Sequence, residues 1–268
     1  MPTTDSHRRL AAVREERPGD PVAPKTTARR RTPVFIVASP RPQVGKTFLA
    51  RLLTDFLRLD GGQAVAFDLN PTGDAPGDRG LAAGTDLTDV RRQMALFDCL
   101  IVEDGIAKVI DLGHGSFAQF FRVVEDIGFI DEACRRAIEP VILFAADPHP
   151  VSFKAFADLQ RRFPRAVAVP VFNETIVKGQ KLREQFRSAR AAAVPLQIPL
   201  LLPILKAHAD RSWHSFADFH AGMPEGVPRG LAVELHAWTR RTFLEFRELE
   251  LRLLLEKLRA SLSPGVRL

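Results

Sequence analysis

The sequence predicts an α/β fold in which a mostly parallel, twisted sheet carries helices on both faces. Short apolar runs without polar alternation, such as 34–38 and 140–146, are typical of strands that are buried on both faces. Amphipathic segments of helical length follow these runs along the chain. This alternation favours parallel strands that are joined by helical crossovers.

The expected elements form one domain over 33–262, with an arm at 1–32 before it and a tail at 263–268 after it. Strands are expected at 33–39, 64–69, 106–111, 140–146, 166–172 and 196–202. Helices are expected at 46–59, 86–103, 151–162, 176–192, 210–221 and 230–262, with two more inside 115–138. A loop rich in Gly, Asp and Pro is expected over 71–85.

Local signals justify the boundaries of these elements. The helix at 46–59 places its apolar residues on one face, and Gly61-Gly62 ends it. Asp104-Gly105 ends the next helix, and Asp147-Pro148 follows the strand at 140–146. Residues that end helices or form turns therefore lie at the boundaries between the predicted strands and helices.

Composition limits the class of protein. The 268 residues suffice for one large α/β domain or two small ones, and a 46% hydrophobic content supports a sizeable core. Cys99 and Cys134 lie in apolar runs, which fits buried thiols in a reducing compartment and gives no metal-ligand spacing. No apolar run approaches a membrane span, and the N-terminus lacks the apolar region of a secretory signal. We expect a cytoplasmic location.

The arm at 1–32 is basic and is expected to be disordered. It holds eight Arg and Lys against four Asp and Glu, so eight minus four gives +4 of the net +6. Two interpretations stay open for it. It is a solvated tail, or it makes a weak electrostatic contact with nucleic acid or an anionic membrane.

The central motif is VFIVASPRPQVGKT at 34–47, an apolar strand that leads through Gly45-Lys46-Thr47 into a helix. Such a strand, loop and helix form the phosphate-binding unit of P-loop proteins. Lys46 would reach the β- and γ-phosphates, and the Thr47 hydroxyl would hold Mg²⁺. Pro40 stands where the standard motif has its first glycine, so an ordinary strand–turn–helix is the alternative. The main chain expected to cradle the phosphates belongs to Val44, Gly45, Lys46, Thr47 and Phe48.

Polar residues cluster at the carboxyl ends of the predicted strands, where open parallel sheets bind ligands. They are Asp68, Asp111, Asp147 and Asn173. Asp111 ends an apolar strand and suits a Walker B role, in which it binds Mg²⁺ through water. The alternative for Asp111 is a cap of the following helix.

These residues together resemble the ParA/MinD family of deviant Walker A ATPases, over about 33–205. The family loop K-G-G-x-G-K-[ST] corresponds to residues 41–47, and its D-x-D-P to Asp68-Leu69-Asn70-Pro71. Its Walker B region corresponds to 111–115. The resemblance implies that Asn173 reads adenine and that the chain near Pro203 packs against the base. It also implies ATP and Mg²⁺ as cofactors, with Thr47, Asp68 and Asp111 at the metal.

The departures from the family pattern bear on catalysis. Arg41 replaces the signature lysine that reaches a partner's phosphates, and it keeps the charge needed for a contact in trans. Pro42 and Gln43 replace two glycines. Asn70 replaces the second carboxylate of D-x-D and cannot act as a carboxylate base. The residues that the resemblance assigns to catalysis are Lys46, Asp68, Asn70 and Arg41.

The resemblance implies an ATP-dependent homodimer that hydrolyses slowly or with a stimulating partner and that positions or partitions cargo. That cargo would be a plasmid, a chromosome or a protein assembly. One alternative is a dethiobiotin-synthetase-like ATP-dependent enzyme. Another is a nucleotide-binding accessory protein for secretion, conjugation or polysaccharide export that does not hydrolyse ATP.

Two surfaces suggest partners. The basic helix at 176–192 is a candidate for nonspecific DNA binding, or simply a solvated face; its cations are Lys178, Lys181, Arg183, Arg187 and Arg190. The last helix carries an apolar stripe of Leu251, Leu254, Leu255, Leu258 and Leu262. Acidic residues beside that stripe disfavour a membrane helix, so we expect it to pack on the domain or on a partner.

Overall fold

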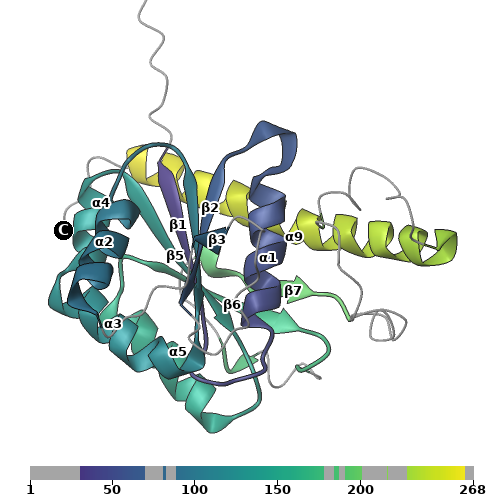
Figure 1. Cartoon of the computed structure of the whole chain (residues 1–268), viewed down its shortest axis with the longest axis horizontal. Helices are drawn as coiled ribbons and strands as arrows, with labels where there is room; N and C mark the ends of the chain where they lie inside the picture. Colours follow the sequence, from purple (N-terminus) through teal and green to yellow (C-terminus); the bar gives the residue numbers. More distant parts are fainter. Residues whose placement is uncertain are drawn as a thin grey trace, which may run out of the picture. The chain divides into compact units, whose positions relative to one another are not determined.

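A seven-stranded sheet with the strand order β3-β2-β4-β1-β5-β6-β7 forms the centre of the chain, and every neighbouring pair is parallel (Figure 1). The computed structural model describes residues 31–69, 81–82, 89–177, 184–186, 191–200, 216 and 228–262. Arg31 and the residues after it form one compact unit. The strands are β1 Thr32–Ala38, β2 Ala64–Leu69, β3 Leu81–Ala82, β4 Ala107–Leu112, β5 Ile138–Ala145, β6 Val167–Asn173 and β7 Leu196–Ile198.

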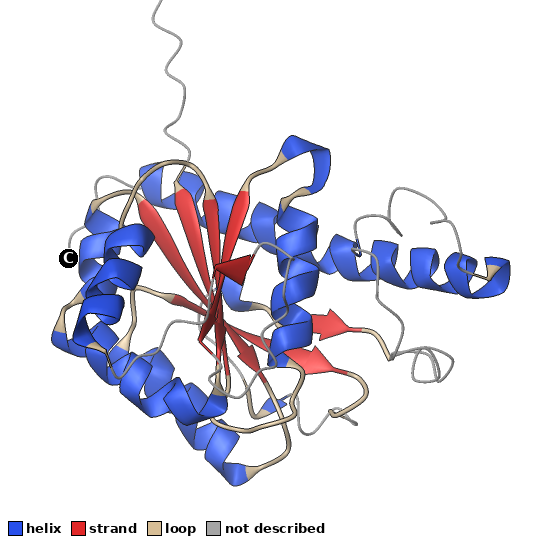
Figure 2. Cartoon of the chain, in the orientation of Figure 1, coloured by secondary structure: helices blue, strands red, loops and turns tan. Residues whose placement is uncertain are grey.

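Helices cover both faces of this sheet (Figure 2). They are α1 Lys46–Leu57, α2 Val90–Leu100, α3 Phe117–Asp126, α4 Phe129–Arg135, α5 Pro150–Arg162 and α9 Arg229–Leu262. Helices α2 to α5 share one apolar core, whereas α1 and α9 share the other. The predicted α/β class with a parallel sheet is therefore confirmed.

The alternation of β1 shows how one strand serves both cores. Val34, Ile36 and Ala38 belong to the core beneath α2 to α5. Phe35 and Val37 point to the opposite side and join the core beneath α1 and α9. Because both faces are covered, a continuous apolar run is what this central strand requires.

The order of the strands places the loop after β1 at the centre of one sheet edge. β1 and β5 are neighbours in the sheet, and the chain leaves β1 toward β2 in one direction and leaves β5 toward β6 in the other. At such a switch point the connections diverge and leave a crevice beyond the strand ends. The predicted phosphate loop follows β1 and therefore begins at this position.

Two predicted elements in the first half differ from the structure. The segment 71–85, expected to be loop, contains the short strand β3, which pairs with β2. The helix expected at 86–103 is α2, which is shorter because Asp89 caps it by accepting a hydrogen bond from the Arg91 amide at 2.8 Å. Residues 70–80 and 83–88 lie outside the described residues.

Two predicted elements in the second half are also wrong in extent. Residues 176 and 177 lie in a turn and a coil, and Ala191–Ala193 form a 3₁₀ helix, so no helix runs through all of 176–192. The last strand ends at Ile198 instead of residue 202. The cations expected at 178–190, residues 1–30 of the arm, the tail at 263–268 and all of 210–221 except Phe216 lie outside the described residues.

Helix α9 covers the edge strand β7 with both apolar and polar contacts. Glu245 accepts a hydrogen bond from the Gln197 amide at 3.1 Å, and Glu256 accepts one from Ala192 at 2.9 Å. The bond from Gln197 satisfies an amide of the edge strand, which otherwise invites pairing with other chains, and the bond from Ala192 ties the 3₁₀ helix Ala191–Ala193 to α9. Glu256 is one of the acidic residues beside the leucine stripe, and in the structure it holds the segment before β7 against α9.

The leucine stripe of α9 does not pack on the domain. Its members Leu251, Leu254, Leu255, Leu258 and Leu262 are 49% to 82% exposed. Phe246, Leu249 and Leu253 occupy the face of the helix that enters the core. The expectation that the stripe packs on the domain is therefore wrong, and a partner for it stays a prediction.

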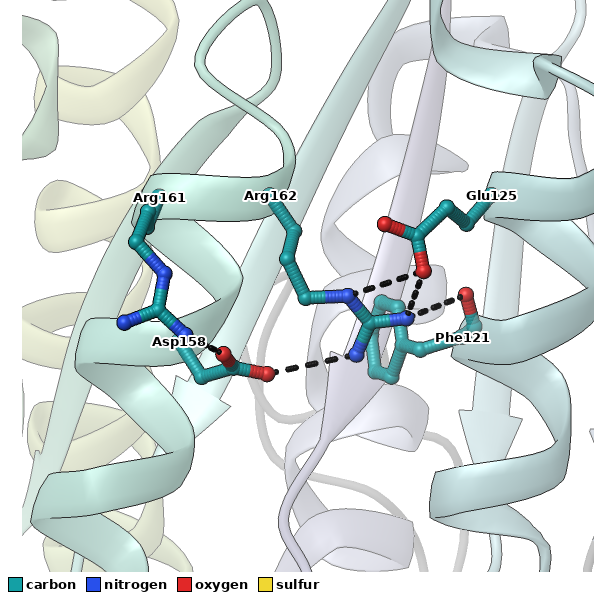
Figure 3. Close-up of polar contacts among 5 residues, drawn as sticks. All are labelled: Phe121, Glu125, Asp158, Arg161 and Arg162. Carbon is teal, nitrogen blue, oxygen red and sulfur yellow. Dashed lines mark hydrogen bonds and ion pairs between the residues drawn. The ribbon is translucent and has the colours of Figure 1, made fainter.

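An arginine network joins the helices of the other layer (Figure 3). Arg162 of α5 donates to Glu125 of α3 at 2.6 and 3.1 Å, and to the Phe121 carbonyl at 3.2 Å. It also donates to Asp158 one turn earlier, which Arg161 contacts from the solvent side. The hydrogen bond with Glu125 raises the pKa of Arg162. The network fixes α5 beside α3 at the amino-terminal edge of the sheet.

Two further expectations can be compared with the described part of the chain. Within it, no helix is both long and apolar enough to cross a membrane. Cys99 is exposed instead of buried, because it lies on the outer side of α2, whose inner side carries Leu96, Phe97 and Leu100. Cys134 is partly buried.

Candidate functional site

The loop between β1 and α1 turns sharply at Gly45. Gly45 has a φ of +87°, in the left-handed region that favours glycine, and α1 begins at the next residue. A Cβ at this position would lie 3.1 Å from the Asn173 side-chain nitrogen. The backbone conformation therefore favours glycine here, and an added Cβ would crowd the Asn173 side chain. Gly45 has no side chain that could cap α1, so its first amides remain available to an anion.

Gln43 also adopts a left-handed conformation, with a φ of 58°. This conformation costs a residue with a Cβ about 1–2 kcal/mol. Gln43 stands where the loop motif that this segment resembles has a glycine. A residue with a side chain therefore adopts a backbone shape suited to glycine, and strain of this kind concentrates at functional sites.

Lys46 reaches back across the loop from the first position of α1. Its Nζ donates to the Arg41 carbonyl at 2.7 Å, and only 8% of the residue is exposed. Burial lowers the pKa of Lys46, while the negative charges of Asp111 and Asp147 act in the opposite direction. The loop thus carries a partly desolvated ammonium group beside two acidic residues.

Asp111 lies near the carboxyl end of β4 and is 3% exposed. Burial raises its pKa, a hydrogen bond with the Thr47 side chain opposes that rise, and the charge of Asp68 adds to it. Asp68 is directly opposite Asp111 in the β2–β4 register. The Oδ1 atom of Asp111 is buried without a hydrogen-bond partner. A buried carboxylate with an unused oxygen beside a second carboxylate is costly unless a cation joins it.

This arrangement fits Mg²⁺. In nucleotide sites Mg²⁺ uses one or two carboxylates and completes its shell with phosphate oxygens and water. Thr47, Asp68 and Asp111 supply such a partial set. No group of three or more His, Cys, Asp and Glu suited to a metal occurs among the residues that the structure describes.

Asn173, the last residue of β6, lies against the phosphate loop. Its Oδ1 accepts a hydrogen bond from the Thr175 amide at 3.0 Å, which fixes the side chain in a turn. Its nitrogen approaches Gly45 as described above. The fold therefore brings the end of β6 to the same site as Lys46, although 127 positions separate the two residues in the chain (173 minus 46).

The remaining predicted phosphate-loop residues take structural positions. Val44 is buried. The Phe48 ring contacts Phe216 and Trp238 at centroid distances of 5.6 and 5.7 Å. Its side chain therefore anchors the start of α1, and only its main chain is left for a phosphate. Trp238 in turn donates to the Pro199 carbonyl at 3.2 Å, next to β7.

The sequence placed Asp147 among the polar residues at the strand ends but assigned it no individual role. It follows β5, is 4% exposed and accepts the His149 amide at 2.7 Å through Oδ1. Its Oδ2 lies 3.8 Å from Arg41 Nε and has no hydrogen-bond partner. The sequence did give one signal, since Asp147 is an acidic residue directly after an apolar strand, like Asp111.

Asn70 and Pro203 lie outside the described residues, so their roles stay predictions. Gly115 lies in the 3₁₀ helix His114–Ser116, where an added Cβ would meet nothing within 4 Å. Steric crowding therefore gives no reason for glycine at that position.

A cavity of about 260 Å³ lies among α3, α4 and the connection from α5 to β6, at the edge of the sheet opposite the phosphate loop. Arg162 and Arg165 line it, but each already pairs with an acidic residue of the same cavity, Glu125 and Asp131. These pairs leave little positive potential for an anion. The strand-end cluster around Lys46 is the stronger candidate site.

No protein-family model matches this chain, and a search of curated proteins gave no match.

Proposed function

We propose that this chain is an ATP-binding switch of the ParA/MinD type. In this proposal it hydrolyses ATP slowly, dimerises when it binds nucleotide, and positions or partitions cargo. The observation that carries the proposal is the buried Asp111 oxygen without a hydrogen bond, opposite Asp68 and beside Thr47 and Lys46. Without a ligand, such a buried group lowers the stability of the fold. Groups that destabilise the fold in this way are typical of functional sites.

Each residue has a chemical task in this proposal. Lys46 and the first amides of α1 bind phosphate oxygens. Thr47 and Asp111 would hold Mg²⁺, which would supply positive charge beside the phosphates. Asp68, with Asn70, orients the attacking water. Asn173 reads the base, and the chain near Pro203 packs against it.

Hydrolysis is expected to be slow or to depend on a partner. Asn70 offers an amide where a carboxylate would act as a base, so water is oriented without a strong proton acceptor. Nonspecific DNA binding through the basic arm and the cations of 178–190 remains part of the proposal, as does an unidentified stimulating or cargo protein.

The experiment is light scattering with and without ATP and Mg²⁺. The proposal expects a mass shift from monomer to dimer only with ATP and Mg²⁺, and no shift in Lys46→Ala, because that variant loses the main phosphate contact. The matched control is Lys257→Ala, which removes a lysine paired with Glu139. It should dimerise like the parent protein. Identical masses with and without nucleotide would contradict the switch.

A second function is an accessory protein that signals by nucleotide occupancy alone, without hydrolysis. Two observations favour it: Asn70 in the sequence, and the ion pair that Arg41 forms within its own chain. Tight ATP binding without phosphate release, with DNA, liposomes or partner proteins present, would select this function.

A further inference from the structure

Arg41 and Asp147 face one another because of the register of two neighbouring strands. β1 and β5 pair in parallel with Ala38 opposite Phe144. Arg41 and Asp147 each lie three residues beyond that pair, since 38 plus 3 is 41 and 144 plus 3 is 147. The Arg41 Nε is 3.8 Å from Asp147 Oδ2. The fold itself therefore places an acidic partner beside the arginine at the front of the loop.

The two side chains have different surroundings. The Arg41 side chain is 42% exposed, whereas that of Asp147 is 6% exposed. The His149 amide satisfies one Asp147 oxygen, and the other has no hydrogen bond. A buried carboxylate oxygen in this state favours a nearby cation. The available cations are Arg41 and Lys46. The charge of Asp147 raises the pKa of Lys46, but burial lowers that pKa by more.

We propose that Asp147 is a positioning residue that holds Arg41 within its own subunit and competes with phosphate for it. This inference depends on the proposed nucleotide site. An ion pair at 3.8 Å to a partly exposed arginine is weak. A phosphate group offers the guanidinium two parallel, charge-assisted hydrogen bonds, which are stronger. Arg41 therefore stays on Asp147 without nucleotide and leaves it when phosphate arrives.

This competition has a consequence for affinity. Asp147 places negative charge beside the phosphate site and also engages one of its cations. Removing that charge should strengthen ATP binding, and most of the gain should come from the freed Arg41. A purely structural Asp147 would instead affect stability and leave ATP affinity independent of Arg41.

The test is a double-mutant cycle on ATP–Mg²⁺ affinity, measured by calorimetry. The proteins are the parent chain, Arg41→Gln, Asp147→Asn and the double variant. We expect Asp147→Asn to bind roughly threefold more tightly or better, and the same change to give little gain in the Arg41→Gln background. An equal effect in both backgrounds, or none, overturns the competition.

A matched control separates this effect from a general loss of negative charge. Asp131→Asn removes a carboxylate from the pair with Arg165, which precedes β6 at the opposite edge of the sheet. Its ATP affinity should equal that of the parent chain. If Asp131→Asn binds ATP as tightly as Asp147→Asn, the gain is a nonspecific charge effect and the proposal fails.

A second readout does not depend on ATP. The Tm values of the same four proteins without nucleotide should be non-additive, because contacting residues couple. Additive Tm shifts overturn the Arg41–Asp147 pair while leaving the nucleotide site intact. If the parent chain binds no ATP, both the proposed nucleotide site and the proposed competition are wrong. This holds even when non-additive Tm values show that Arg41 and Asp147 interact.

Discussion

Asp111 is the residue at which the needs of folding and of function conflict most clearly. It is buried, faces Asp68 across the register and keeps one oxygen without a hydrogen bond. Burial raises its pKa, so the folded state holds the Asp111 proton more tightly than the unfolded state does. At neutral pH the carboxylate therefore destabilises the nucleotide-free fold.

Asp111→Asn should raise the free energy of unfolding at pH 7 by about 1 kcal/mol, because it removes a buried charge and keeps the shape. The check is urea unfolding without nucleotide. The difference in the free energy of unfolding between this variant and the parent protein should shrink as the pH falls through the raised pKa of Asp111 toward the ordinary value of 3.8. The reason is that Asp111 of the folded parent protein then becomes protonated and loses its charge. A less stable Asp111→Asn at pH 7 would contradict this account.

At the scale of elements, α9 shows how helical phase decides the role of neighbouring leucines. Leu253 is 4% exposed and joins the core with Phe246 and Leu249, whereas Leu254 is 50% exposed. The sequence predicted that the stripe of Leu251, Leu254 and their neighbours packs on the domain or on a partner, whereas the domain buries another apolar face of the helix. The leucine-rich run offers apolar residues on more than one side of the helix.

Leu253→Ala should lower the free energy of unfolding by about 2–4 kcal/mol, because it leaves a cavity in the core shared by α1 and α9. Leu254→Ala is the matched control, with the same chemical change one position later on the exposed side. Its effect should stay within about 0.5 kcal/mol. Equal losses in the two variants, measured by urea unfolding, would contradict the assigned face of α9.

The elements also show where sequence reasoning succeeds. The strands that were predicted best are those buried on both faces, because only a continuous apolar run can serve two cores, as β1 does. The two residues of β3 carry too little pattern to be recognised in a Gly-rich segment. The predicted helix at 86–103 is longer than α2 because the apolar pattern alone does not show that Asp89 caps the start of the helix.

At the scale of the whole molecule, the parallel sheet assembles the candidate site from distant segments. The sequence identified Lys46, Thr47, Asp68, Asp111 and Asn173, since strand ends of a parallel sheet meet at one edge. It did not indicate that Arg41 pairs with Asp147, because that contact depends on which strands are neighbours and on their register. Pairing order is a property of the fold that local pattern does not encode.

The central claim is that this strand-end cluster is a site for ATP and Mg²⁺. The most direct measurement is calorimetric titration of ATP into the parent protein with Mg²⁺ and with EDTA, alongside Thr47→Ala. The account predicts binding that is at least about tenfold weaker without Mg²⁺ and a reduced Mg²⁺ effect in Thr47→Ala, because Thr47 supplies a metal ligand. Absence of ATP binding in the parent protein, or affinity that is the same with Mg²⁺ and EDTA, would contradict it.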